Sequence, residues 1–246
     1  MLKSQLSLYK SKFLTALGLT TISLFLAANP AQAFTLVDRS GFTDGDFNNL
    51  LSDGEFTELF VAEGRIGNNS LNNAERELGI NTSTGLPVAS GQRIWGNGTP
   101  VDFTLEYTGT QVNYTVNGEL LSSNAFASVA DNIFLRTRAA DDSSITLSNL
   151  AFNGTAIGQD LFSSVSEAGT DIDYLEISDI SSPFTLTGEI LMSWTGTIPT
   201  NSRLAYQIKV GSTKSIPEPG AVGAMFLVGV AAVGYSKRKQ SVKASV

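Results

Sequence analysis

The chain has no cysteine and no histidine among its 246 residues. Without cysteine there are no disulfides, so the stability of the fold must come from an apolar core. Histidine is the side chain that most often acts as a general base near neutral pH, and it is also the commonest ligand of transition metals. The two absences therefore remove the usual means of acid–base catalysis and of transition-metal binding.

Positive charge is scarce in the central part of the chain. Residues 34–215 contain nine Lys and Arg against twenty-two Asp and Glu, which gives a formal charge of −13. Such an acidic surface repels the phosphates of nucleic acids, so we expect no DNA or RNA partner. The composition suits a soluble secreted protein, and it also suits a protein that meets divalent cations.

The N-terminus has the pattern of an export signal. Three lysines lie within the first twelve residues, an apolar stretch follows over residues 13–28, and Pro30 ends it. Ala31-Gln32-Ala33 then places small residues at the positions that signal peptidase reads. This order predicts a cleaved signal peptide over residues 1–33, with an uncleaved N-terminal anchor as the alternative.

The C-terminus combines three features in a fixed order. Pro217-Glu218-Pro219 is held extended, because each proline fixes φ and restricts the residue before it. An uncharged apolar run over residues 220–235 would form about 24 Å of helix. That length is short for a bilayer core of roughly 30 Å, although flanking Lys and Arg can snorkel to the interface. The basic cluster Lys237-Arg238-Lys239 would stay on the cytoplasmic side.

This order resembles the PEP-CTERM sorting signal of Gram-negative bacteria, including cyanobacteria. The resemblance implies that residues 216–246 form a sorting signal with one transmembrane helix. It also implies that an exosortase-type membrane protease recognises Pro217, Glu218 and Pro219 and cuts near them. The protein would then pass through the inner membrane and reach the cell surface or the medium. The alternative is a permanent C-terminal anchor.

Residues 34–215 are enough for one extracytoplasmic domain with a full core. Apolar and polar residues alternate over residues 101–107 and again over 112–116, with a hairpin-sized linker between them. Asn117-Gly118 follows as a favoured two-residue turn, because both positions require a positive φ. The pattern predicts an antiparallel meander with one buried face and one face in water.

Other segments predict further strands. Phe56 and Phe60 would share a face if their strand is regular. About ten strands with frequent turns indicate an all-β, antiparallel two-sheet sandwich, and a jelly roll is the arrangement we favour. The additional strands are predicted at residues 34–38, 55–62, 132–138, 144–152, 174–177, 184–194 and 204–210.

Three segments of the domain do not have a strand pattern. Residues 42–54 are rich in Asp, Asn and Gly and predict a loop, and residues 81–91 predict a Ser/Thr/Gly loop. Residues 68–79 predict the one helix, with Asn69 or Ser70 as its N-cap and Gly79 at its end.

Parts of the domain resemble known bacterial surface domains. Residues 108–118 and 145–154 resemble concanavalin-like and choice-of-anchor domains. Residues 184–196 and 202–211 are similar in style to the choice-of-anchor W group. Such domains are named for their variable C-terminal sorting signals, which agrees with the tail of this chain. The resemblance supplies no catalytic residues.

The acidic segment 44–55 is the best candidate for a metal site. Asp44, Asp46, Asn48 and Glu55 have the spacing of calcium ligands in an EF-hand-like loop. However, Asn49 stands where such loops have glycine, and the flanking sequence is typical of strands. We therefore favour a solvated acidic loop and assign no metal site, with calcium as the alternative.

A second acidic segment, with Asp171, Asp173 and Glu176, loosely resembles the acidic strand of laminarinase-type glycoside hydrolases. Retaining hydrolysis requires two carboxyl groups roughly 5–5.5 Å apart. Asp171 and Asp173 share a strand face, and a bulge could bring Glu176 onto it. The first carboxylate is Asp where that family has Glu, one methylene shorter. We favour charged positions on an exposed strand and assign no catalytic residue.

The two tryptophans are the aromatic residues most relevant to binding. Trp95 could stand at a rim of the sandwich and stack on a sugar ring, although a place in the core is the interpretation we favour. Trp194 ends an apolar strand and is predicted to lie in the core. Together these patterns predict an exported, non-catalytic structural or adhesive protein associated with extracellular polysaccharide. A carbohydrate-binding module and a glycan-active hydrolase are the alternatives.

Overall fold

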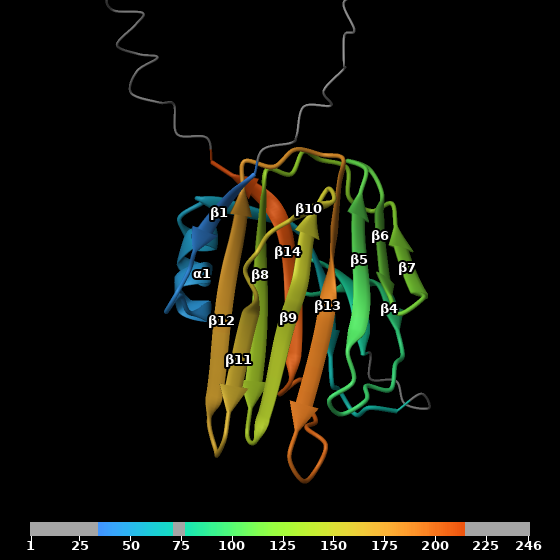
Figure 1. Ribbon diagram of the computed structural model, residues 1–246. Helices are drawn as coiled ribbons and strands as arrows, with labels where there is room; N and C mark the ends of the chain where they lie inside the picture. Colours follow the sequence, from blue (N-terminus) through green and yellow to red (C-terminus); the bar gives the residue numbers. More distant parts are fainter. Residues whose placement is uncertain (1–33, 71–76, 215–246) are drawn as a thin grey trace, which may run out of the picture. The chain divides into compact units, whose positions relative to one another are not determined.

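A computed structural model describes residues 34–70 and 77–214 of the chain (Figure 1). The predicted signal peptide (1–33) and sorting signal (216–246) lie outside these residues. The described residues contain fourteen strands and one helix. None of their helical segments is long and apolar enough to cross a membrane.

The first sheet contains seven strands that all pair antiparallel. Their order across the sheet is β1, β12, β8, β14, β2, β3 and β4. Neighbours in this sheet therefore come from distant parts of the chain. The bounds are β1 Thr35–Asp38, β12 Thr170–Ser178, β8 Asn132–Ala140, β14 Ala205–Thr213, β2 Phe56–Arg65, β3 Leu78–Thr82 and β4 Pro87–Gly91.

The second sheet is also antiparallel and has seven strands. The order is β10, β9, β13, β5, β6 and β7, and β11 pairs with another part of β9. The bounds are β10 Thr155–Ala156, β9 Ser143–Phe152, β13 Phe184–Trp194, β5 Val101–Tyr107, β6 Val112–Val116, β7 Glu119–Ser123 and β11 Leu161–Val165.

The main core lies between the two sheets and is built from alternating strand positions. Along β5, each second residue from Val101 to Tyr107 is buried, while Asp102 and Glu106 are exposed. The β6–β7 turn has φ of +46° at Asn117 and +85° at Gly118, as the predicted two-residue turn requires. The prediction of an all-β fold with two antiparallel sheets and a β5–β7 meander is confirmed.

The predicted loop at residues 42–54 is wrong, because Asp44–Ser52 form helix α1. Thr43 is the N-cap: its hydroxyl accepts a hydrogen bond from the Asp46 amide, and the Asp46 carboxylate accepts one from the Thr43 amide. This reciprocal capping box satisfies two backbone donors that a helix start would otherwise leave unpaired. Phe47, Leu50 and Leu51 then pack on the first sheet, at the spacing of one helix face.

The other two segments without a strand pattern also need correction. The predicted loop at 81–91 contains the end of β3 and the whole of β4, which pair as a hairpin. The predicted helix at 68–79 is wrong at both described ends, and its middle (71–76) lies outside the described residues. Asn69 has φ of +54°, which is unlike the extended backbone of an N-cap, and Leu78 already begins β3.

A bulge in β2 overturns the expectation that Phe56 and Phe60 share a face. Glu58 pairs with Gly211 and Phe60 with Val210, so Leu59 is an extra residue in the ladder. Because side chains alternate with a period of two, one extra residue moves the following ones to the other face. Phe60 therefore enters the main core, whereas Phe56 lies on the outer face of the first sheet.

Helix α1 covers a second, smaller apolar cluster on that outer face. Phe47 of the helix meets Phe56, Phe134 and Tyr174 of three strands, with ring centroids 5.3–5.9 Å apart. These rings exclude water from one part of the face, and polar side chains occupy the part beside it. The first sheet is thus packed on both sides where α1 lies.

Candidate functional site

A groove of about 310 Å³ lies on the outer face of the first sheet, beside α1. Its walls are mainly polar, and four of the nine Lys and Arg residues of the segment 34–215 line it. The lining residues are Asp44, Phe47, Asn48, Glu63, Arg65, Arg136, Arg138, Tyr174, Ser202, Ala205, Gln207 and Lys209. It therefore gathers much of the scarce positive charge of an acidic domain.

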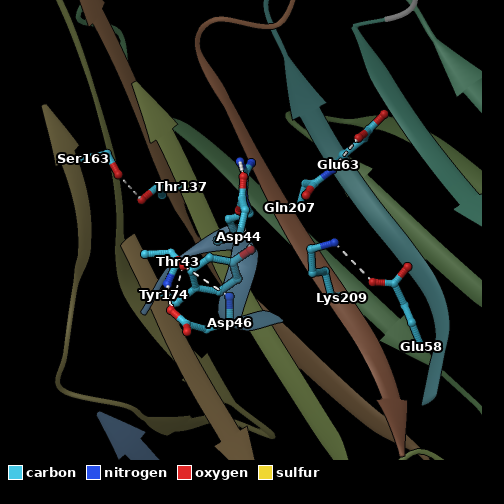
Figure 2. A network of polar contacts seen from close by, with 11 residues as sticks. Thr43, Asp44, Asp46, Glu58, Glu63, Thr137, Ser163, Tyr174, Gln207 and Lys209 are labelled. Carbon is cyan, nitrogen blue, oxygen red and sulfur yellow. Dashed lines mark hydrogen bonds and ion pairs between the residues drawn. The ribbon is translucent and has the colours of Figure 1, made fainter. Parts of the chain in front are cut away.

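Strand register explains which side chains meet in the groove. Tyr174, Arg136, Gln207 and Glu63 are direct neighbours across β12, β8, β14 and β2. Neighbouring strands lie about 4.8 Å apart, so these four form a continuous polar row. Gln207 donates a hydrogen bond to the Glu63 carboxylate over 3.1 Å, which joins the two strands at one end of the row (Figure 2).

A second row runs parallel to the first. Ile172, Arg138, Ala205 and Arg65 are direct neighbours across the same four strands. Ala205, with its short side chain, lies between the long cationic side chains of Arg138 and Arg65.

Asp44 joins α1 to the polar row. One of its oxygens accepts from Arg136 Nε and the other from Arg136 Nη2, each over 2.6 Å. The Tyr174 hydroxyl donates to the same carboxylate over 2.7 Å. Burial by itself would raise the pKa of Asp44, but the hydrogen bonds from Arg136 and Tyr174 and the charge of Arg136 outweigh it and lower the pKa below 3.8.

Lys209 of β14 is a second cation that contacts α1, through the ring of Phe47. Its ammonium lies 3.2 Å from the Glu58 carboxylate (Figure 2). It also lies 4.5 Å from the ring centroid of Phe47. Burial raises the pKa of Glu58, and the nearby Lys209 only partly opposes this shift. The two carboxylates beside the helix thus differ: the fold stabilises the charge of Asp44 and disfavours that of Glu58.

The calcium-binding loop, the alternative for residues 44–55, is not formed. Asp44, Asp46 and Asn48 lie on a helix, so they cannot wrap around one ion, and Glu55 is exposed beyond the helix end. Asp44 binds Arg136, and Asp46 caps the helix. Within residues 34–70 and 77–214 there is no group of three acidic side chains that could hold a metal. The favoured solvated loop is wrong as well, because Asp44 anchors the helix to the sheet.

The acidic strand does not bring its three carboxylates together. β12 pairs with β8 without a bulge, so Asp171 and Asp173 face β11 while Glu176 points to the opposite side. Asp171 accepts a hydrogen bond from the Ser164 amide over 2.8 Å, and Asp173 accepts one from the Phe162 amide over 3.3 Å. The arrangement expected of a retaining hydrolase is therefore absent from this strand.

Asp171 and Asp173 instead connect the two sheets. β11 pairs with β9 in the second sheet and lies against β12 of the first (Figure 1). Asp171 and Asp173 satisfy amides on the side of β11 that faces away from β9, and so they link the edges of the two sheets. Glu176 accepts from Arg39 Nε over 2.7 Å and from Asn132 over 2.6 Å.

Trp95 lies in the core, so its alternative role as an exposed sugar platform is wrong. It is only 3% exposed, and its indole nitrogen donates to the Arg65 carbonyl over 2.9 Å. The Arg93 guanidinium lies over its ring, 5.0 Å from the centroid. Trp194 is half-buried and packs against the edge of the main core, which agrees in part with its predicted core position.

Of the residues that line the groove, the sequence patterns single out Asp44 and Asn48, and only as possible calcium ligands. The alternation in residues 132–138 does place Arg136 and Arg138 on one strand face. Nothing in the local pattern, however, indicates that Gln207, Ala205 and Arg65 lie beside them, because those residues come from strands far away in the sequence. Charged residues that are conserved among homologues on one strand face are the signal that indicates such a surface.

The fold and the groove define an all-β sandwich protein with a charged groove on one outer face. No model of a protein family matches this chain, and a comparison with curated proteins also finds no match. The PEP-CTERM and choice-of-anchor resemblances therefore stay predictions. Pro217, Glu218 and Pro219 lie outside the described residues.

Proposed function

We propose that this chain is an exported, non-catalytic cell-surface protein whose β-sandwich holds extracellular polysaccharide in the groove beside α1. In this proposal, residues 1–33 are a signal peptide and residues 216–246 are a PEP-CTERM signal read by an exosortase-type protease. The domain between them is of the choice-of-anchor kind, with a jelly-roll arrangement of its sheets. It reaches the cell surface or the medium after transient insertion in the inner membrane.

The observation that carries the proposal is the polar groove on the outer face of the first sheet. Binding sites for drug-like ligands are mostly apolar and occupy about 300–1,000 Å³. This groove has a volume at the lower end of that range, but charged, amide and hydroxyl groups line it. A sugar matches such a lining, because its hydroxyls both donate and accept hydrogen bonds. The groove favours a carbohydrate-binding domain over a purely structural one.

The positions of the carboxylates support binding without catalysis. Asp44 is committed to Arg136 and Tyr174, and Glu63 accepts from Gln207. On the far side of β12, Asp171 and Asp173 are committed to the amides of β11. A hydrolase would need a carboxyl pair at a fixed separation around the bond that it cuts. The hydrolase alternative therefore has little support.

A binding assay on the full chain, purified in mild detergent, tests the proposal. We expect the protein to bind at least one class of polysaccharide on an array, and to co-sediment with the matrix polysaccharide of its own host. Gln207→Trp fills the groove and should weaken binding at least tenfold. Thr115→Trp places the same ring on the outer face of β6 in the second sheet and should leave binding unchanged. Equal binding by both variants, or no binding by wild type, would contradict the proposal.

A further inference from the structure

We infer that the groove recognises an acidic sugar unit, whose anionic group is held between Arg138 and Arg65 above the methyl group of Ala205. This inference rests on the proposed function and names the chemistry of the ligand for the same site. The anionic group is a carboxylate or a sulfate ester carried on a sugar ring, and both are planar or tetrahedral oxyanions that arginine recognises.

The distribution of charge is the first argument. The segment 34–215 has a formal charge of −13, yet four cationic side chains and only two carboxylates line the groove. An acidic surface repels an anionic chain over most of its area, so association is favoured where cations gather. Positive charge concentrated in one groove of an acidic protein selects an anionic ligand over a neutral one.

The second argument separates the cations that are already paired from one that is not. Arg136 is engaged by both oxygens of Asp44, and Lys209 is paired with Glu58. Arg138 makes neither an ion pair nor a side-chain hydrogen bond with any residue of 34–70 or 77–214, and its Nε is buried without an acceptor. A buried donor without an acceptor costs free energy, so Arg138 gains more from an added anion than Arg136 would.

The geometry of the second row is the third argument. Arg138 and Arg65 stand on strands that flank β14, so their backbones lie roughly 10 Å apart across the sheet. Both side chains are long enough to lean toward Ala205, which lines the groove and is 7% exposed. Arg65 has partners of its own, and we assign it only the opposite wall and its charge. A carboxylate over Ala205 would meet cations on two sides.

The rest of the lining suits the sugar ring that carries the anion. Gln207 neighbours Ala205 two residues along β14, and its side chain projects from the same face. Asn48 of α1 and Ser202 also line the groove. These side chains offer amide and hydroxyl groups near Arg138 and Arg65. The hydroxyls of the sugar ring would lie against them once the anionic group is bound between the two arginines.

Calorimetry with defined oligosaccharides tests the ligand class. We expect the full chain in mild detergent to bind tetragalacturonate, or a sulfated galactose tetramer, at least tenfold more tightly than the methyl ester of tetragalacturonate. The methyl ester keeps the sugar and removes the charge. The affinity should fall steeply as NaCl is raised, and whichever acidic tetramer binds more tightly identifies the anionic group. Equal affinity for the ester would overturn the inference and leave the proposed function standing.

Substitutions test the assigned residues. Arg138→Gln should weaken binding of the acidic tetramer about tenfold or more, because it removes an ionic hydrogen-bond donor. Arg203→Gln removes an arginine from an exposed ion pair with Asp141 outside the groove lining, and it should leave the affinity unchanged. Circular dichroism melts of both variants check that the fold is kept. Equal losses in the two variants would mean that general charge, and not the groove, governs binding.

A substitution at Ala205 tests the anion position through the melting temperature of the ligand-free protein. Ala205→Glu places a carboxylate between Arg138 and Arg65, where we infer that the ligand anion lies. We expect it to melt at a higher temperature than Ala205→Gln, which has the same length and no charge, and to bind the acidic tetramer more weakly than Ala205→Gln. A lower melting temperature for Ala205→Glu would overturn the inferred anion position. Absence of binding to every acidic and neutral saccharide tested would overturn the proposed function together with the inference.

Discussion

The contact between Asp44 and Arg136 makes a quantitative prediction about how α1 is attached. Changing Asp44 to Asn keeps the size of the side chain and removes its charge. The Arg136 side chain is only 9% exposed, and both of its hydrogen bonds to the carboxylate would be lost or weakened. Tyr174 would also exchange a charged acceptor for a neutral one. The helix N-terminus would then lose its ion pair with Arg136 of the sheet.

The size of the effect follows from the burial of the two partners. Removing one partner of a fully buried ion pair costs about 3–5 kcal/mol, because the other charge is left unpaired. The Asp44 side chain is 46% exposed, so water screens the pair and can solvate part of the orphaned guanidinium. We therefore expect Asp44→Asn to lower the free energy of unfolding by about 1.5–3 kcal/mol at pH 7.

The pH dependence of the free energy of unfolding tests the same prediction a second way. The pKa of Asp44 is lower in the fold than its ordinary value of 3.8, so the unfolded chain binds more protons over the interval between the two values. The stability that this carboxylate contributes is therefore fully present above pH 3.8 and is lost as pH falls through the folded pKa. The difference between wild type and Asp44→Asn should be constant near neutrality and should shrink in strong acid.

Urea unfolding of the full chain at several pH values measures this difference, and Glu58→Gln is the matched control. Burial raises the pKa of Glu58, so its charged form is disfavoured in the fold and its contribution to stability falls as pH rises above 4.5. At pH 7 Glu58→Gln has a cost of its own, because it leaves the largely buried Lys209 unpaired. Its deficit should grow as pH falls toward 4.5, whereas the deficit of Asp44→Asn should shrink in strong acid. The reasoning is refuted if Asp44→Asn is as stable as wild type at pH 7, or if its deficit is the same at every pH.

Three further predictions concern the bulge, the domain boundaries and the sorting motif. Gly211→Ala should destabilise the fold by about 2 kcal/mol or more, because a Cβ there would lie 2.2 Å from the Thr57 carbonyl oxygen. Thermal melts measure this loss, and an unchanged melting temperature would contradict the prediction. A polypeptide of residues 34–215 should express solubly, give a β-type circular dichroism spectrum and melt cooperatively, whereas an unfolded spectrum would show that the boundaries are wrong. Replacing Pro217-Glu218-Pro219 by three alanines should leave the protein full length, after signal removal, in the inner membrane. Wild type should lose its basic tail, and mass spectrometry of the mature protein that finds residues 237–246 still attached would disprove processing.

Local patterns in the sequence were sufficient for much of the second sheet. The alternation over residues 101–107 and 112–116 has a period of two, and a positive φ at Asn117 and Gly118 suits few residues other than these. Each strand and its turn are adjacent in the chain, so register follows from the pattern alone. The same reasoning explains why most of the longer strands were predicted close to their observed bounds.

Composition was misleading where a helix signal lay inside an acidic segment. Residues 42–54 contain many Asp and Asn, which favour loops, but Thr43 and Asp46 are spaced as a capping box before Phe47, Leu50 and Leu51. The apolar face packs on Phe134 and Tyr174 of two distant strands, and on Phe56, which the bulge at Leu59 turns outward. The helix is therefore predictable from its cap, and its docking site is not.

The sequence by itself determined the all-β class, the meander, the acidic character of the domain and the residue types available for chemistry. The tertiary structure alone decided what each carboxylate and arginine does. Asp44 meets Arg136 from 92 residues away, and Ala205 separates two arginines from β8 and β2. Spacing along the chain governs which residues share a strand face, because the backbone alternates. Pairing between distant strands governs which faces stand side by side, and that pairing follows from burial of the whole core and from one-residue shifts such as the bulge at Leu59.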